Sequence, residues 1–149
     1  MIDSTTYFLA YFYPRVAVFD DYSGWDRMDF TDSQEFYNDF NDYILNVSVP
    51  KNYIVWATGD LKNPDDVLTS SYSRKFASTL RNDAIVRVAS PDDILQGKVT
   101  AQKPTNTWTW TSGHISDVTC ALSNQLRMGR IQRCRRPVYP QKSQRSVRL

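Results

Sequence analysis

Aromatic residues are denser between positions 11 and 60 than elsewhere in the chain, and this density limits what the sequence can fold into. A buried aromatic ring removes a large area from water, and the polar edges of tyrosine and tryptophan need hydrogen-bond partners. The stretch therefore predicts a packed sheet surface or a contact face between domains. Its aromatic members include Phe12, Tyr13, Phe19, Tyr22, Trp25, Phe30, Phe36, Tyr37, Phe40, Tyr43, Tyr53 and Trp56.

Carboxylates are interleaved with these aromatic residues, and three interpretations are open for them. They could form a calcium site, a sugar-binding face, or a solvated rim around a buried aromatic row. Because runs of charge are usually solvated, the rim is the favoured interpretation. The carboxylates are Asp20, Asp21, Asp26, Asp29, Asp32, Glu35, Asp39 and Asp42.

Four unusual sequence blocks follow one another in the same stretch. They are residues 13–21 (YPRVAVFDD), 24–26 (GWD), 34–40 (QEFYNDF) and 49–59 (VPKNYIVWATG). In this order they resemble the N-terminal non-catalytic domain of bacterial aminopeptidase N-like zinc metallopeptidases, a branch of the gluzincins, and the resemblance extends to Ser123. It implies a β-rich domain that precedes a thermolysin-like catalytic domain, with zinc held in that catalytic domain. It also implies that this chain is an incomplete domain, because the family's domain starts earlier.

The histidine content bears directly on catalysis. A gluzincin needs two histidines four residues apart on a helix and a later glutamate to bind zinc, with a further glutamate as general base. His114 is the single histidine of the chain, so H-E-x-x-H cannot be present. We therefore predict no catalytic, cofactor-binding or metal-binding residues, and no peptidase activity for the chain alone. We expect His114 to be a surface or capping residue.

Two cysteines, Cys120 and Cys134, match neither a metal-binding spacing nor a disulfide framework. We expect Cys120 to be a buried thiol. The sequence also lacks G-x-S-x-G, P-loop and G-x-G-x-x-G motifs.

Hydrophobic periodicity predicts a mainly β fold, an antiparallel sheet or saddle-like sandwich with one medium and one short helix. Residues 42–49 alternate, with Tyr43, Leu45, Val47 and Val49 on one face, and a turn at 50–52 would join them to a strand at 53–58 as an antiparallel hairpin. Residues 105–111 alternate too, with Trp108 and Trp110 on one face. The helices are expected at 64–81 and 91–96, and further strands at 84–89 and 118–122.

The N-terminal part gives a weaker pattern. Pro14 interrupts the apolar residues 7–19, so a single strand across that span is not expected. Residues 20–33 are rich in Asp, Ser and Gly and are typical of a loop. Within it, we expect Trp25 to anchor the loop to the core.

Charge divides the chain into two parts, residues 1–124 and 125–149. The first carries ten Lys/Arg and all sixteen Asp/Glu, a net charge of −6, whereas the second carries eight Lys/Arg and no acid, a net charge of +8. A chain of 149 residues suits one domain. No apolar run reaches the length of a membrane span, and the first residues do not resemble a signal peptide, so the compartment stays undetermined.

We predict that the basic tail, residues 125–149, is disordered and dispensable, with a short helix at 125–133 as the competing interpretation. In the family, the strand ending at Ser123 continues into Tyr-x-Trp-Asp. Read one base later, the codons for residues 126–130 can supply that motif, so the tail can be a frameshift product. The rival is a real basic arm, which would bind polyanions weakly and without sequence preference.

Three functions follow from these patterns. The first is a non-catalytic N-terminal domain that packs on the catalytic domain of an aminopeptidase N-like zinc metallopeptidase and shapes the substrate entrance. The second is a stand-alone β-sandwich binding module that uses Trp25, Trp108 and Trp110 on carbohydrate or protein. The third is a nucleic-acid-associated protein that uses the basic tail. Unpaired strand edges and exposed aromatics also predict self-association.

Overall fold

The computed structural model describes residues 4–27, 37–81, 86–125 and 128–130. As predicted, the fold is mainly β. Its main sheets are both three-stranded and antiparallel, with the strand orders β1-β9-β5 and β4-β8-β6. The strands are β1 (Tyr7–Leu9), β2 (Phe19–Asp20), β3 (Gly24–Trp25), β4 (Asn41–Pro50), β5 (Ile54–Ala57), β6 (Asp60–Leu61), β7 (Val86–Ala89), β8 (Thr105–Ile115), β9 (Cys120–Ser123) and β10 (Met128–Arg130). The helices are α1 (Pro64–Val67), α2 (Ser70–Ser78) with a 3-10 turn at Thr79–Arg81, and α3 (Pro91–Leu95).

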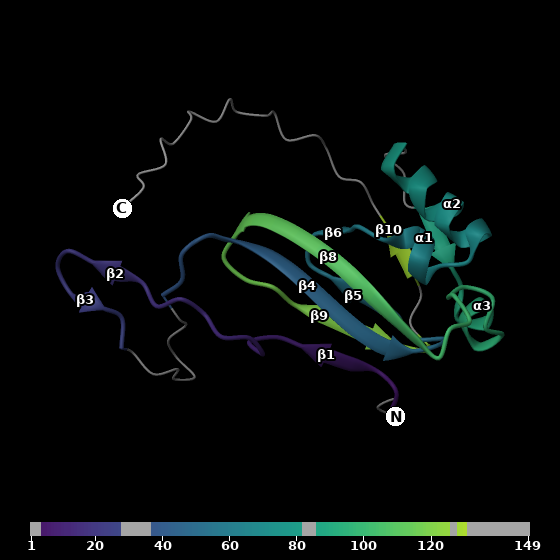
Figure 1. The fold of residues 1–149 in the computed structure, drawn as a ribbon, viewed down its shortest axis with the longest axis horizontal. Helices are drawn as coiled ribbons and strands as arrows, with labels where there is room; N and C mark the ends of the chain where they lie inside the picture. Colours follow the sequence, from purple (N-terminus) through teal and green to yellow (C-terminus); the bar gives the residue numbers. More distant parts are fainter. Residues whose placement is uncertain (1–3, 28–36, 82–85, 126–127, 131–149) are drawn as a thin grey trace.

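The core comprises inward residues of the two three-stranded sheets together with residues of α1, α2, β7 and α3. In Figure 1 the long, curved strands β4 and β8 pass in front of β5 and β9, and the helices gather at one end. Trp108 and Trp110 of β8 are 0% and 2% exposed, and the ring of Trp110 meets that of Trp56 at 5.5 Å, edge to face. The predicted alternation of β8 is therefore confirmed, and its tryptophan face is the centre of the core.

The alternation of β4 is also confirmed, but the predicted hairpin with β5 is wrong. Leu45, Val47 and Val49 point inward, and the residues between them are exposed. The turn after Pro50 exists, since the Tyr53 amide donates to the Pro50 carbonyl at 3.3 Å. However, β4 pairs with β8 and β5 pairs with β9. The turn thus carries the chain from one sheet to the other, because apolar faces on both strands can then cover each other.

The helix predicted at 64–81 is interrupted at Leu68 and Thr69. Leu68 has an extended backbone (φ −107°, ψ 154°) and is buried, and it bridges to Thr100. The Thr69 amide donates to the Val99 carbonyl at 2.9 Å. Pairing with the segment at 99–101 therefore replaces one helical turn, and the serine-rich sequence that follows has too low a helix propensity to prevent it.

Helix α3 begins as the sequence predicts. The Ser90 hydroxyl accepts a hydrogen bond from the Asp93 amide, and the Asp93 carboxylate accepts one from the Ser90 amide, which forms a capping box. The strand before it, β7, ends in the fully buried residues Val88 and Ala89. This part of the chain is thus fixed to the core from both sides of Ser90.

The N-terminal part differs from the expected loop. Residues 19–25 form a small hairpin, β2 paired with β3, which projects at the end of the molecule opposite the helices (Figure 1). Trp25 does not anchor it to the core: it is 57% exposed and its ring packs on Phe19 across the hairpin at 5.1 Å. The strand β1 ends at Leu9, so no single strand crosses residues 7–19, as predicted.

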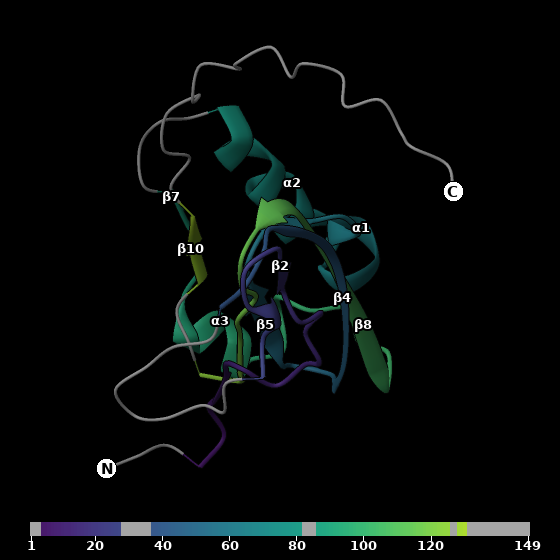
Figure 2. The same ribbon diagram turned by 90° about the vertical axis from the view of Figure 1, so that its left-hand side faces the viewer.

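Part of the basic tail is a strand rather than a disordered segment or a helix. β10 pairs antiparallel with β7, and Figure 2 shows the two strands side by side at the flank of the sandwich. An edge strand can recruit a neighbour through backbone groups alone, so the tail's sequence pattern does not reveal this pairing. Residues 126–127 and 131–149, with Cys134, lie outside the described residues.

Candidate functional site

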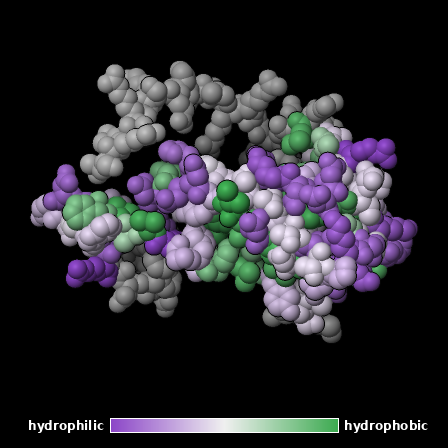
Figure 3. Space-filling model, in the orientation of Figure 1, coloured by the Kyte–Doolittle hydropathy of each residue, from purple (hydrophilic) through white to green (hydrophobic). Residues whose placement is uncertain are grey.

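Exposed apolar side chains are concentrated in the N-terminal segment, residues 7–25. Nine large apolar residues there are exposed, whereas the described residues after Ile44 contain two, Leu80 and Leu95. A monomeric soluble protein rarely exposes a large apolar patch unless the patch has a partner. The nine residues are Tyr7, Phe8, Leu9, Tyr11, Phe12, Val16, Phe19, Tyr22 and Trp25. Figure 3 shows hydrophobic residues towards the projecting end of the molecule.

Backbone pairing fixes the start of this segment to the sandwich. β1 pairs with β9 along its three residues, from Tyr7 opposite Leu122 to Leu9 opposite Cys120. Just before it, the hydroxyls of Thr6 and Ser123 are 2.8 Å apart. β1 therefore holds its exposed side chains on a rigid support instead of a loose terminus.

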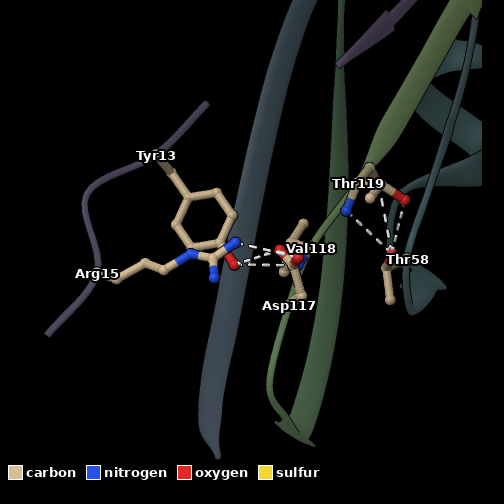
Figure 4. Close-up of polar contacts among 6 residues, drawn as sticks. All are labelled: Tyr13, Arg15, Thr58, Asp117, Val118 and Thr119. Carbon is tan, nitrogen blue, oxygen red and sulfur yellow. Dashed lines mark hydrogen bonds and ion pairs between the residues drawn. The ribbon is translucent and has the colours of Figure 1, made fainter. Parts of the chain in front are cut away.

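A polar tether fixes the middle of the segment (Figure 4). The Tyr13 hydroxyl donates to one Asp117 carboxylate oxygen at 2.6 Å, and an Arg15 guanidinium nitrogen lies 3.0 Å from the other. The Val118 amide donates to the Tyr13 hydroxyl at 3.1 Å. Asp117 lies in the connection between β8 and β9, so this tether joins the N-terminal segment to the core strands. The same connection is held from its other side by Thr58, whose hydroxyl accepts from the Thr119 amide at 3.1 Å.

The electrostatics of the tether indicate a structural role. Burial, and then the hydrogen bond to Asp117, raise the pKa of Tyr13 above its ordinary value. The hydroxyl therefore stays protonated and keeps donating. The Arg15 guanidinium also lies over the rings of Tyr11 and Tyr13, at 5.1 and 5.3 Å from their centroids, in cation–π geometry. Chemically, this arrangement positions the segment and offers no activated nucleophile.

A hollow of about 260 Å³ opens beside the tether. Tyr11, Tyr13 and Tyr37 line it together with Arg15 and Asp26. Its volume is just below the range of small-molecule sites. The hollow thus belongs to the same exposed surface as the apolar residues around it.

Three of the carboxylates that suggested a metal or sugar site accept hydrogen bonds from backbone amides. Asp20 accepts hydrogen bonds from the amides of Tyr22 and Ser23 in the hairpin turn. Asp39 and Asp42 accept from the amides of Phe40 and His114. The bonds of Asp20 are those that Asp makes in turns, whereas the bond of Asp42 joins β4 to β8. Asp29, Asp32 and Glu35 lie outside the described residues, and within the described part of the chain no group of three metal-ligating side chains converges.

His114 and Cys120 occupy the environments expected from the sequence. His114 is exposed, has a positive φ of 55°, and stacks on Phe40 with ring centroids 5.0 Å apart. Cys120 is a free buried thiol, and burial raises its pKa. The buried thiolate is thus disfavoured, which makes Cys120 a core residue rather than a nucleophile.

Two of the three tryptophans proposed for a binding module are in the core. Trp108 and Trp110 cannot contact carbohydrate or protein without unfolding the sandwich, and this part of the prediction is wrong. Alternation predicts that two side chains share a face, but it does not say whether that face is covered. Trp25 alone of the three is exposed.

The Asp117 tether was not visible in the sequence. Tyr13 and Asp117 are 104 positions apart, and Asp117 stands in an ordinary turn sequence. The one usable signal is the sequence Tyr13-Pro14-Arg15. In it a proline fixes the backbone between an aromatic residue and a cation.

Comparisons with protein-family models, with curated proteins and with solved structures find no match to this chain. The resemblance to the peptidase family therefore rests on the sequence blocks alone. In the described part of the chain, no helix has the length and apolar character needed to cross a membrane.

Proposed function

We propose that this chain is the non-catalytic N-terminal domain of an aminopeptidase N-like zinc metallopeptidase, and that it docks on the catalytic domain through the N-terminal segment. The observation that carries the proposal is the concentration of exposed apolar side chains at residues 7–25 on a support that holds them in place. The sequence blocks that resemble the family overlap this segment at 13–21 and 24–26. The surface that needs a partner and the sequence that suggests the partner thus coincide.

The exposed residues of this segment are mostly aromatic, and this favours docking on another protein. Aromatic residues supply large contact areas at a low entropic cost, and they are enriched where proteins bind each other. Phe8 and Trp25 are each more than half exposed, at opposite ends of the segment. Asp20 and Asp21 lie at the hairpin tip and Asp26 at its base, so the partner surface would be apolar with a basic rim.

In this proposal the catalytic domain binds the zinc ion, and this chain does not. The chain's single histidine cannot form the zinc-binding motif of the family, so the metal and the general base would belong to the catalytic domain. Residues of this chain would bind that domain, exclude water from the contact and narrow the approach of substrate.

Binding to a catalytic domain tests the proposal. The chain is titrated into an aminopeptidase N-like enzyme from which the N-terminal domain has been removed, and complex formation is followed by calorimetry. We expect a complex, with a change in KM for aminoacyl reporter substrates. We expect Phe8→Ser and Trp25→Ser each to weaken it by about 1–2 kcal/mol, whereas Leu95→Ser, on α3, leaves it unchanged.

Two outcomes would contradict the proposal. One is the absence of any complex with such enzymes up to the solubility limit of the chain. The other is chelator-sensitive hydrolysis by the purified chain alone, because it would require a metal site that the sequence does not encode.

A further inference from the structure

β4 is an edge strand of unusual length. It has 10 residues and stands at the end of the order β4-β8-β6, so β8 covers one of its edges. Within the described residues, no strand pairs with the other edge. The remaining edge strands of the two three-stranded sheets, β1, β5 and β6, have 3, 4 and 2 residues. β4 is therefore the longest template for a further strand in this part of the chain.

The hydrogen bonds of β8 reveal which backbone groups of β4 face the open edge. The Thr109 carbonyl accepts from the Lys62 amide, and the Thr109 amide donates to the Asn63 side chain, so Thr109 points away from β4. Backbone direction alternates along a strand. The neighbours Trp108 and Trp110 consequently point their backbone groups towards β4, opposite Val47 and Leu45.

It follows that Ile44, Asn46 and Ser48 direct their amides and carbonyls to the open edge. Pro50 has the same parity, and proline is tolerated in a sheet where its missing donor faces an edge. The position of Pro50 thus agrees independently with the assignment.

The middle of this edge carries no charge that would oppose pairing, and the bulge at Asn41–Tyr43 and Pro50 lie at its two ends. No charged residue occurs from Tyr43 to Pro50, whereas protected edges carry lysine or inward-pointing charge. Ile44 is 74% exposed on the outer face, and Leu45 and Val47 on the inner face are only partly buried. A strand added here would cover apolar surface on both faces of β4.

We infer that β4 binds β4 of a second copy of this chain, antiparallel about a two-fold axis at Asn46. In this register Ile44 lies opposite Ser48 of the second copy, Leu45 opposite Val47, and Asn46 opposite Asn46. Each of the three edge-facing pairs exchanges two backbone hydrogen bonds, and the half-buried residues Leu45 and Val47 cover each other.

Self-complementarity favours a second copy over another partner. An isologous dimer places every residue against its symmetry mate, so any charge near the axis would meet a like charge. β4 is uncharged over this span, and Asp42 would lie near Pro50 of the second copy. This dimer uses the β4 edge and not residues 7–25, so it does not depend on the proposed function.

Sedimentation of the full chain at increasing concentration tests the dimer. We expect a monomer–dimer equilibrium whose dissociation constant rises by about tenfold or more in Asn46→Lys, because two ammonium groups then face each other at the axis. The matched control is Thr107→Lys, which puts the same charge on the exposed face of the neighbouring strand and should leave the equilibrium unchanged. Phe8→Ser should also leave it unchanged.

A cross-link fixes the register. Residues in a hydrogen-bonded antiparallel pair have Cα atoms about 5.5 Å apart, within the range that a disulfide spans. In a Cys134→Ser background, we expect oxidised Asn46→Cys to run as a covalent dimer, and Thr107→Cys as a monomer. Monomers at every concentration would overturn the inference, and so would a dimer that tolerates Asn46→Lys or is lost in Phe8→Ser.

Discussion

At the scale of single residues, Gly59, which lies between β5 and β6, is constrained in both its backbone conformation and its packing. Its φ is +105°, and a Cβ there would overlap the Thr111 carbonyl and lie 2.8 Å from the Ser112 Cβ. Gly24 also has a positive φ, of +74°, but its Cβ would meet no atom within 4 Å. Two glycines with similar backbone demands thus differ in packing alone.

We expect Gly59→Ala to lower the free energy of unfolding by roughly 3 kcal/mol, because the backbone of β8 must move as well as the turn. Gly24→Ala is the matched control and should cost roughly 1 kcal/mol, the conformational term alone. Urea denaturation of both variants measures the difference. Equal losses would contradict this expectation, because they would show that a methyl group at position 59 fits without displacing β8.

Tyr13 gives a second prediction at this scale. Tyr13→Phe removes a donor to Asp117 and an acceptor for the Val118 amide, so we expect a loss of roughly 1–2 kcal/mol in the free energy of unfolding. Tyr22→Phe is the control, because Tyr22 is 99% exposed and should change stability by less than about 0.5 kcal/mol.

The pH dependence of this tether has a definite sign. The pKa of Tyr13 is raised in the folded state, so its contribution is fully present below the ordinary tyrosine pKa of about 10 and is lost as the pH rises above it. Tyr72 shifts in the same direction, and comparison with Tyr13→Phe isolates Tyr13. We expect the wild-type chain to lose more stability than Tyr13→Phe between neutral pH and pH above 10. Parallel pH profiles would contradict this assignment.

At the scale of elements, local sequence signals predicted which face of a strand is buried and where a helix begins. They did not predict which strands pair with each other. The alternation of β4 and β8 and the capping residues of α3 act within a few positions, and the structure agrees with them. Pairing is decided elsewhere. β4 pairs with β8 and β5 pairs with β9 instead of with each other, and α1 stops where Leu68 bridges to Thr100 and the Thr69 amide donates to the Val99 carbonyl. Neither competitor is readable from the turn or helix sequence itself.

The capping box of α3 supplies the prediction for this scale. Ser90→Ala should lower the free energy of unfolding by about 1 kcal/mol, because the Asp93 amide loses its acceptor. Ser90→Thr keeps the hydroxyl and should recover most of that loss. Thermal melting of the two variants checks the order, and an equal effect of both would mean that packing around Ser90 matters more than the cap.

At the scale of the whole molecule, the contrast between a buried middle and an exposed N-terminal segment could be anticipated only in part. Aromatic density at 11–60 predicted a packed sheet surface or a contact face between domains. In that stretch Trp56 packs on Trp110, while Trp25 remains exposed, so the contact face stays a prediction. Whether an aromatic side chain is buried or exposed depends on which strand covers which face. That arrangement is a property of the assembled sheets. The tether at Asp117 is of the same kind, since it joins residues 104 positions apart.

The role of the tail is the last prediction at this scale, and β10 sharpens it. Truncation after Asn124 removes β10 and leaves the β7 edge without the partner that pairs with Val86, Arg87 and Ala89, next to the fully buried Val88. We expect this truncation to lower the free energy of unfolding by about 2 kcal/mol, well beyond the usual effect of a surface change.

Truncation after Arg130 is the matched control, because it keeps β10 and removes residues 131–149. We expect its thermal midpoint to equal that of the full chain, which would make the rest of the basic tail dispensable. If truncation after Asn124 is also without effect, β10 contributes nothing and the whole tail can be an out-of-frame appendage. If it destabilises as expected, residues 128–130 are part of the folded protein, and a frameshift origin for them would have to explain how an unselected sequence completes a sheet.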